Sequence, residues 1–93
     1  MAHTSRDKKK LINRVRRIRG QVDAIERALE EDIDECSAIL QTIAACRGAI
    51  NGLMAELVES HIRFHVIDPN AHPNSNQTQA AEEVIEVVNT YLK

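Results

Sequence analysis

The sequence predicts an all-α protein built from three helices. Apolar residues recur at intervals of three and four along two long segments and a shorter C-terminal one, which is the spacing of one face of a helix. Both prolines fall in one polar stretch, so neither long segment is interrupted. At 93 residues the chain has room for a single domain, residues 1–93, and with one Phe, one Tyr and no Trp it can bury only a thin core. We therefore expect association between copies to supply part of its stability.

The first helix is expected to begin at Thr4 or Ser5, either of which can cap it, with Asp7 in its first turn. The acidic stretch EEDIDE at 30–35 ends it. The apolar stripe of this helix is typical of the seam of a helical bundle and comprises Leu11, Val15, Ile18, Val22, Ile25 and Leu29.

The start of this helix is strongly basic. Residues 6–19 carry eight basic side chains and one acidic side chain, a net charge of +7 in a chain whose total is −2, which leaves −9 on the remainder. A basic N-terminal third on an acidic protein indicates a polyanionic partner, with nucleic acid ahead of a membrane surface. The alternative interpretation is a solvated helix face.

The second helix is expected to begin near Asp34, a good N-cap, and to continue to about His65. Its length of roughly 45 Å is too great for a chain of this size to cover by itself. The stretch GAING at 48–52 places two glycines one turn apart, which would let another helix approach closely. The apolar stripe comprises Cys36, Ile39, Leu40, Ile43, Ile50, Leu53, Leu57, His61 and Phe64.

The polar stretch DPNAHPNSNQ at 68–77 predicts a loop, because helices end before proline. A short helix over 78–92 follows. Its β-branched residues would also suit a strand, but spacing of three and four rather than two favours a helix. The residues that this helix places on one face are Ala81, Val84, Ile85, Val88, Tyr91 and Leu92.

A metal site is predicted where ESHIRFHV ends the second helix. His61 and His65 are four residues apart, so their imidazoles share a helix face and can chelate one ion. Cys36 on the same stripe is the candidate third ligand, but it lies roughly 37 Å from His61 along the helix. The three side chains meet only if the second helices of two chains pack antiparallel, with Ile50 and the GAING glycines near the two-fold axis.

One thiolate with two imidazoles suits Zn(II), Co(II), Ni(II) or Cu(II). His3, near the N-terminus, could add a third imidazole and favour six-coordinate Ni(II) or Co(II) over tetrahedral Zn(II). The alternative for His3 is a histidine in a tail with no ligand role. Cys46, mid-helix with no histidine in register, is interpreted as a small core residue, and His72 as a solvated loop residue.

The segments RVRRIRGQVDAIERALEE (14–31) and ECSAILQTIAACRGAINGLMAELVESHI (35–62) resemble the CsoR/RcnR family of bacterial metal-sensing repressors, and the likeness covers nearly the whole chain. The resemblance implies an all-α protomer, an antiparallel four-helix-bundle dimer and a homotetrameric dimer of dimers. It also implies that flat basic faces bind operator double-stranded DNA until an effector weakens that binding. The family's site between protomers corresponds to Cys36, His61 and His65.

Within the family, copper sensors have a cysteine where His65 stands, and formaldehyde sensors have proline where Ala2 stands. Persulfide sensors need a second reactive cysteine at the site, and Cys46 is not in that position. The nickel/cobalt sensors resemble this chain in its opening MAHTSRDKKKL and in a ligand set that corresponds to His3, Cys36, His61 and His65. The resemblance therefore implies Ni(II) or Co(II) as the regulatory ligand, with Zn(II) as the alternative.

The expected DNA contacts are the basic side chains Lys8, Lys9, Lys10, Arg14, Arg16, Arg17, Arg19 and Arg47. Three rival functions stay open: a formaldehyde-responsive repressor of the same fold with Cys36 as nucleophile, a metal-buffering bundle without a DNA role, and a hydrolase using Glu59 as base. The expectation is that the protein is not an enzyme. The sequence has no apolar run approaching the ~20 residues of a membrane span and no signal-peptide pattern, and its two cysteines suit a reducing cytosol.

Overall fold

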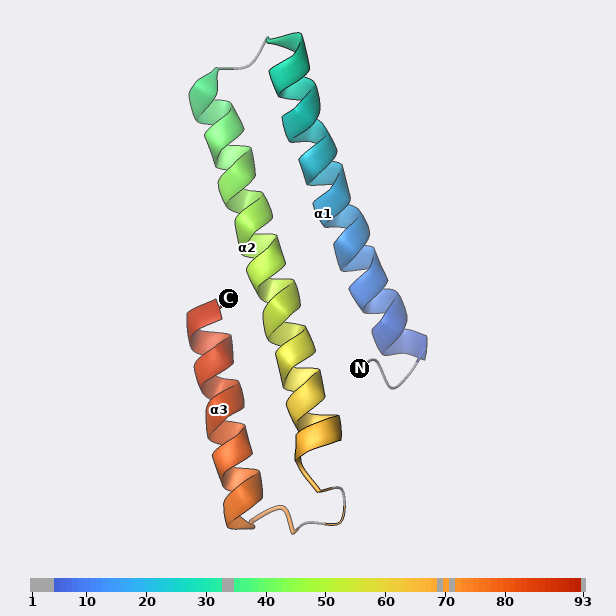
Figure 1. Cartoon of the computed structure of the whole chain (residues 1–93), viewed down its shortest axis with the longest axis vertical. Coiled ribbons are helices and arrows are strands. Elements are labelled where there is room, and N and C mark those ends of the chain that lie inside the picture. The colour runs from blue at the N-terminus through green and yellow to red at the C-terminus, as the bar shows by residue number, and fades with distance from the viewer. Residues whose placement is uncertain (1–4, 33–34, 69, 71, 93) are drawn as a thin grey trace.

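The structure is a computed structural model that describes residues 5–32, 35–68, 70 and 72–92 (Figure 1). Its elements in chain order are α1 (Ser5–Glu31), α2 (Cys36–His61), the π-helical turn η1 (Ile62–Val66) and α3 (Asn76–Leu92). No strand occurs in this part of the chain, which confirms the all-α, three-helix prediction. None of the described helices is both long and apolar enough to cross a lipid bilayer.

The three helices form a flat plate, with principal extents of 57 × 27 × 13 Å. Figure 1 shows α1 antiparallel to α2, with α3 along the other side of the C-terminal half of α2. Within the described ranges α3 contacts α2 and η1 but not α1. Because the plate is a single layer of helices, its broad faces are not covered by the same chain. Stable domains normally pack at least two layers, so this architecture supports the expectation that copies associate.

The ends of α1 and α2 lie close to the predicted positions. Asp32 follows α1 with a φ of 52°, and its backbone N–H donates to the Ala28 carbonyl at 3.1 Å, so a left-handed residue closes the helix within the acidic stretch. The N-cap position of α2 is held by Glu35 rather than Asp34, and Glu35 makes no side-chain capping hydrogen bond. Thr4 and Asp34 lie outside the described residues.

The predicted extent of the second helix is confirmed, but its last turn is not α-helical. After His61 the chain continues as η1, and the Ile67 N–H donates to the Ile62 carbonyl at 3.0 Å, an i to i+5 hydrogen bond. A π turn widens the helix locally, and such turns are frequent at functional sites.

The core is small, as the composition predicted. Among the described residues only Cys46, Ala55 and Ile85 are buried apolar residues. This confirms the prediction that Cys46 is a small core residue. In the single chain, the stripe predicted for the first helix divides into two rows. Leu11, Ile18 and Ile25 are half-buried in this chain, whereas the alternate positions are 46–62% exposed, namely Val15, Val22 and Leu29.

The same division occurs on the other helices. On α2, Leu40, Ile43 and Ile50 are exposed, and on the apolar face of α3 Val84 and Tyr91 are 50% and 79% exposed. Spacing identifies which residues share an apolar face. That face can be wider than the area that one neighbouring helix of the same chain covers.

The loop is more ordered by hydrogen bonds than predicted. The Asn74 N–H donates to Nδ1 of His72 at 3.0 Å, and the Thr78 hydroxyl donates to the His72 carbonyl at 3.3 Å. The Thr78 N–H donates to the Ser75 hydroxyl at 3.2 Å. Ser75 therefore caps α3, which begins two residues before the predicted start. His72 is exposed but shapes this turn rather than being only solvated.

Candidate functional site

The two histidines of the predicted metal site lie together at the end of α2. His61 is the last α-helical residue, and His65 lies in η1. Their rings stack with centroids 5.3 Å apart and an interplanar angle of 28°, and both side chains are exposed. The structure therefore brings this pair together as the four-residue spacing predicted.

Cys36 lies at the opposite end of the same helix. It is the first residue of the 26-residue α2 and is an exposed free thiol. At ~1.5 Å per residue it is roughly 37 Å from the histidine pair. In the part of the chain that the structure describes, no three His, Cys, Asp or Glu side chains converge on one point, and His3 lies outside it. A site containing Cys36 and both histidines thus needs two chains.

The donor chemistry of these three side chains fits a borderline divalent metal ion. A thiolate and two imidazoles are ligands that Zn(II), Co(II) and Ni(II) share, whereas the hard cations Mg(II) and Ca(II) prefer oxygen. Exposure of all three side chains leaves them accessible to a partner chain.

An apolar groove on α2 ends at His61. Its volume is about 380 Å³, and it is lined by Ile50, Leu53, Met54, Leu57, Val58 and His61. Ile50 and Met54 are 47% and 42% exposed in the single chain. The middle of α2 therefore offers apolar surface directly beside one half of the candidate metal site.

Arg63 ties η1 to α2 and α3. Its guanidinium donates to both carboxylate oxygens of Glu82 on α3, at 2.6 and 3.2 Å, and lies 3.6 Å from Glu59 one turn earlier. The Asn89 side-chain amide donates to Glu59 at 3.3 Å. The hydrogen bond to Glu82, partly opposed by burial, raises the pKa of Arg63. The network fixes the turn that carries His65.

This network was not predicted. Glu59 was considered only as a base for a hydrolase, although its spacing of four residues from Arg63 is the ordinary signal of a helical ion pair. The contact with Glu82 crosses between helices, and no local spacing in the sequence indicates it.

The predicted DNA-binding side chains fall into two groups. Six of them are exposed and make no ion pair with any described residue, namely Lys8, Lys9, Arg16, Arg17, Arg19 and Arg47. The other two, Lys10 and Arg14, are paired with Glu56 of α2 at 3.6 and 3.2 Å. Basic residues at neighbouring positions of α1 therefore differ in whether they form an ion pair with a carboxylate of the same chain.

Gly52 has a role different from the one expected. A Cβ atom at this position would lie 3.0 Å from an Nη atom of Arg14 in the same chain, whereas at Gly48 it would meet nothing within 4 Å. The prediction that both glycines serve an approach between two second helices is thus wrong for Gly52, whose open space is occupied by Arg14.

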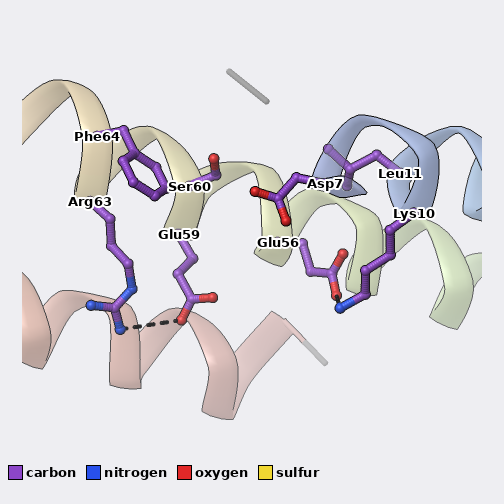
Figure 2. A pocket seen from close by; sticks show the side chains of 8 residues that line it. All are labelled: Asp7, Lys10, Leu11, Glu56, Glu59, Ser60, Arg63 and Phe64. Atoms are coloured by element: carbon purple, nitrogen blue, oxygen red, sulfur yellow. Dashed lines mark ion pairs between the residues drawn. The ribbon is translucent and has the colours of Figure 1, made fainter. Parts of the chain in front are cut away.

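A charged cleft of about 290 Å³ lies where the start of α1 meets the end of α2, and Figure 2 shows it from close by. Lys10 extends to Glu56 at one end of the cleft, and Arg63 extends to Glu59 at the other. The cleft lining comprises Asp7, Lys10, Leu11, Glu56, Glu59, Ser60, Arg63 and Phe64.

Comparisons with known proteins identify the family of the chain. Residues 7–90 match the family model of metal-sensitive transcriptional repressors. The chain is 40% identical over 93 residues, the full length of both proteins, to the transcriptional repressor RcnR of Salmonella paratyphi B. It is 53% identical, again over both full lengths, to an uncharacterized protein in the bioA 5′ region of Serratia marcescens. A solved structure of a Glu-to-His variant of the formaldehyde-responsive regulator FrmR, from Salmonella enterica serovar Typhimurium, is similar with a TM-score of 0.69 and 47% identity, covering 97% of this chain and 99% of that one.

Proposed function

The chain belongs to the family of metal-sensitive transcriptional repressors, and on that premise we propose that it represses metal-efflux genes until Ni(II) or Co(II) binds. Family membership makes it a transcriptional repressor rather than an enzyme. The proposal concerns the effector, the residues that bind it, the residues that bind DNA, and the assembly.

One observation carries the proposal. The continuous segment of α2 and η1 bears an exposed thiol at one end and two exposed, stacked imidazoles at the other, and an apolar groove runs from its middle to His61. If two copies of α2 pack antiparallel through this face, Cys36 of one protomer lies beside His61 and His65 of the other. The same packing would cover the exposed row on α1 that contains Val15, Val22 and Leu29.

The metal would supply a link between protomers when bound. The chain's own residues would determine the response: Cys36 on one helix and the histidine pair on the other would both be drawn towards the ion. His3 is proposed as a further ligand because nitrogen-rich sites favour Ni(II) or Co(II) over tetrahedral Zn(II), which remains the alternative effector.

Repression requires a DNA-binding face, and the exposed cations of α1 support one. Their contacts would be chiefly with phosphates, so affinity should fall steeply with salt. No aromatic side chain lies among them, and sequence preference would depend partly on DNA shape. A dimer of dimers would present several copies of this face to operator DNA. By linkage, DNA must weaken metal binding by the same factor as metal weakens DNA binding.

The test is an anaerobic Co(II) titration of the reduced protein by absorption spectroscopy, with and without operator DNA. A near-ultraviolet sulfur-to-cobalt band that saturates at one metal per chain, with weak visible bands, is expected for a six-coordinate site. The variant Cys36→Ala should lose the band and stay on DNA when cobalt is added. Intense visible bands would indicate a tetrahedral site and favour Zn(II), and absence of a sulfur band would exclude Cys36 as a ligand.

The likeness to a formaldehyde-responsive regulator favours one alternative effector. In that case the exposed Cys36 thiol would add across the C=O bond of formaldehyde, its sulfur bonding to carbon and its proton passing to oxygen. Formaldehyde should then give a covalent mass increase that Cys36→Ala abolishes, and His65→Ala should retain the response. The metal proposal predicts the opposite for His65→Ala.

A further inference from the structure

A single carboxylate on α2 holds two of the cations expected to contact DNA. Oε1 of Glu56 lies 3.2 Å from Nη2 of Arg14 and 3.6 Å from Nζ of Lys10. The Glu56 side chain is 17% exposed, whereas those of Arg14 and Lys10 are 34% and 65% exposed. The anion is thus sheltered between the helices, while the two cations lie at the rim of this contact.

The position of Arg14 depends on α2 in a second way. Its guanidinium lies against Gly52, where a Cβ would come within 3.0 Å of Nη1. Gly52 lies one helical turn before Glu56, so the same stretch of α2 provides both the space and the counter-charge. Arg16 and Arg17, by contrast, are exposed and have no carboxylate within ion-pair distance among the described residues.

Carboxylate and phosphate compete for the same partners. Arginine binds either anion through its planar N–H groups, and lysine binds either as a point charge. A cation that contacts Glu56 must leave it, or share it, before it can neutralise a DNA phosphate. Because both cations are partly exposed, solvent weakens their attraction to Glu56, so phosphate can displace the carboxylate, but only at a cost in affinity.

We propose that Glu56 acts as an internal competitor for DNA phosphate, holding Lys10 and Arg14 so that the protein binds DNA less tightly and with fewer phosphate contacts than its basic residues would allow. The proposal rests on the DNA-binding face proposed above. It assigns to Glu56 a function in setting DNA affinity, and it divides the basic residues into a free group that drives binding and a held group that contributes little.

The test measures the salt dependence of affinity for a duplex of random sequence, because the phosphate contribution does not depend on sequence. Each additional phosphate contact steepens the slope of log K against log salt by ~0.9. The variant Glu56→Gln should therefore bind more tightly at low salt and have a slope steeper by up to ~1.8 for each protomer on the DNA. Between 50 and 200 mM salt the variant should lose up to about 12-fold more affinity than the unmodified protein for each protomer on the DNA, the factor that this slope implies.

The matched control is Glu83→Gln on α3. It changes net charge by the same amount, but α3 does not contact α1 within the described ranges. The control should leave the slope unchanged. Circular dichroism and sedimentation would check that both variants keep the helicity and assembly of the parent. An unchanged slope for Glu56→Gln, or weaker binding by a correctly folded variant, would overturn the proposal, and the latter result would mean that Glu56 positions Lys10 and Arg14 on DNA instead.

A pair of lysine variants tests the idea without altering Glu56. Lys9 and Lys10 are adjacent and exposed, but only Lys10 contacts Glu56. Lys9→Met should lower the slope by ~0.9 per contacting protomer, while Lys10→Met should change it little, and equal losses would refute the competition. If the combined variant Arg16→Gln, Arg17→Gln also leaves the slope unchanged, the DNA-binding face itself has been wrongly proposed. If the slope of log K against log salt becomes shallower in that variant but no steeper in Glu56→Gln, only the role of Glu56 is refuted.

Discussion

The bridge between Arg63 and Glu82 is expected to stabilise the C-terminal part of the fold. It joins η1, which carries His65, to α3 through two hydrogen bonds of 2.6 and 3.2 Å. The variant Glu82→Gln keeps the shape of the side chain and removes its charge. Among the described residues, Arg63 would then retain only Glu59, at 3.6 Å, as a counter-charge.

The expected loss is modest because the pair is partly exposed. The Arg63 and Glu82 side chains are 39% and 48% exposed, so solvent screens their attraction. Exposed pairs contribute about 0.2–1 kcal/mol, and the two-bond geometry places this pair near the upper end, at about 1 kcal/mol. For a domain of this size such a loss lowers the Tm by about 4–8 °C.

Thermal unfolding followed by circular dichroism measures this difference. Protein concentration must be equal in all samples, because association makes the Tm concentration-dependent. Glu83→Gln is the control, since Glu83 is an exposed neighbour that forms no ion pair within the described part of the chain. In about 1 M salt, where the Debye length falls to ~3 Å, the two variants should converge. Equal melting temperatures at low salt would refute the role of the bridge.

Three further outcomes are expected. Val22→Ser should weaken dimerisation, because Val22 is 49% exposed in the single chain and is expected to be covered by the partner. Losing the burial of half a valine side chain in each of two protomers costs about 2 kcal/mol, which raises the dimer Kd roughly 30-fold in sedimentation equilibrium. An unchanged Kd would show that Val22 lies outside the interface. Gly52→Ala should raise the unfolding free energy by less than the ~1 kcal/mol that alanine normally adds over glycine in a helix, because Arg14 must move away from the new Cβ. Urea denaturation that showed the full increase would contradict this contact. The folded state raises the pKa of Arg63, so the contribution of Arg63 to stability is complete below the ordinary arginine pKa and is lost only as pH rises through the folded value. The difference in unfolding free energy between the parent and Arg63→Met should therefore stay constant over roughly pH 6–9. A difference that declines across that range would contradict the assignment.

The sequence by itself determined the helices and the placement of the candidate ligands along them. Helical periodicity and the polar breaks defined the elements to within about two residues, because those signals are local. The distance between Cys36 and His61 followed from the rise of one uninterrupted helix, and the proximity of His61 and His65 followed from their spacing. These results need no knowledge of neighbouring helices.

Only the tertiary structure decided how the side chains are used. Val15 and Ile18 belong to one predicted stripe, yet Val15 is exposed while Ile18 is half-buried. The apolar face is wider than the area that one neighbouring helix covers, so either row of residues could have been the one that packs against α2. Arg14 and Arg16 look equivalent in the sequence, but only Arg14 meets Glu56 and the open space at Gly52. Such differences depend on which residues of a second helix lie opposite, and that register is set by packing between helices rather than by any pattern within one of them.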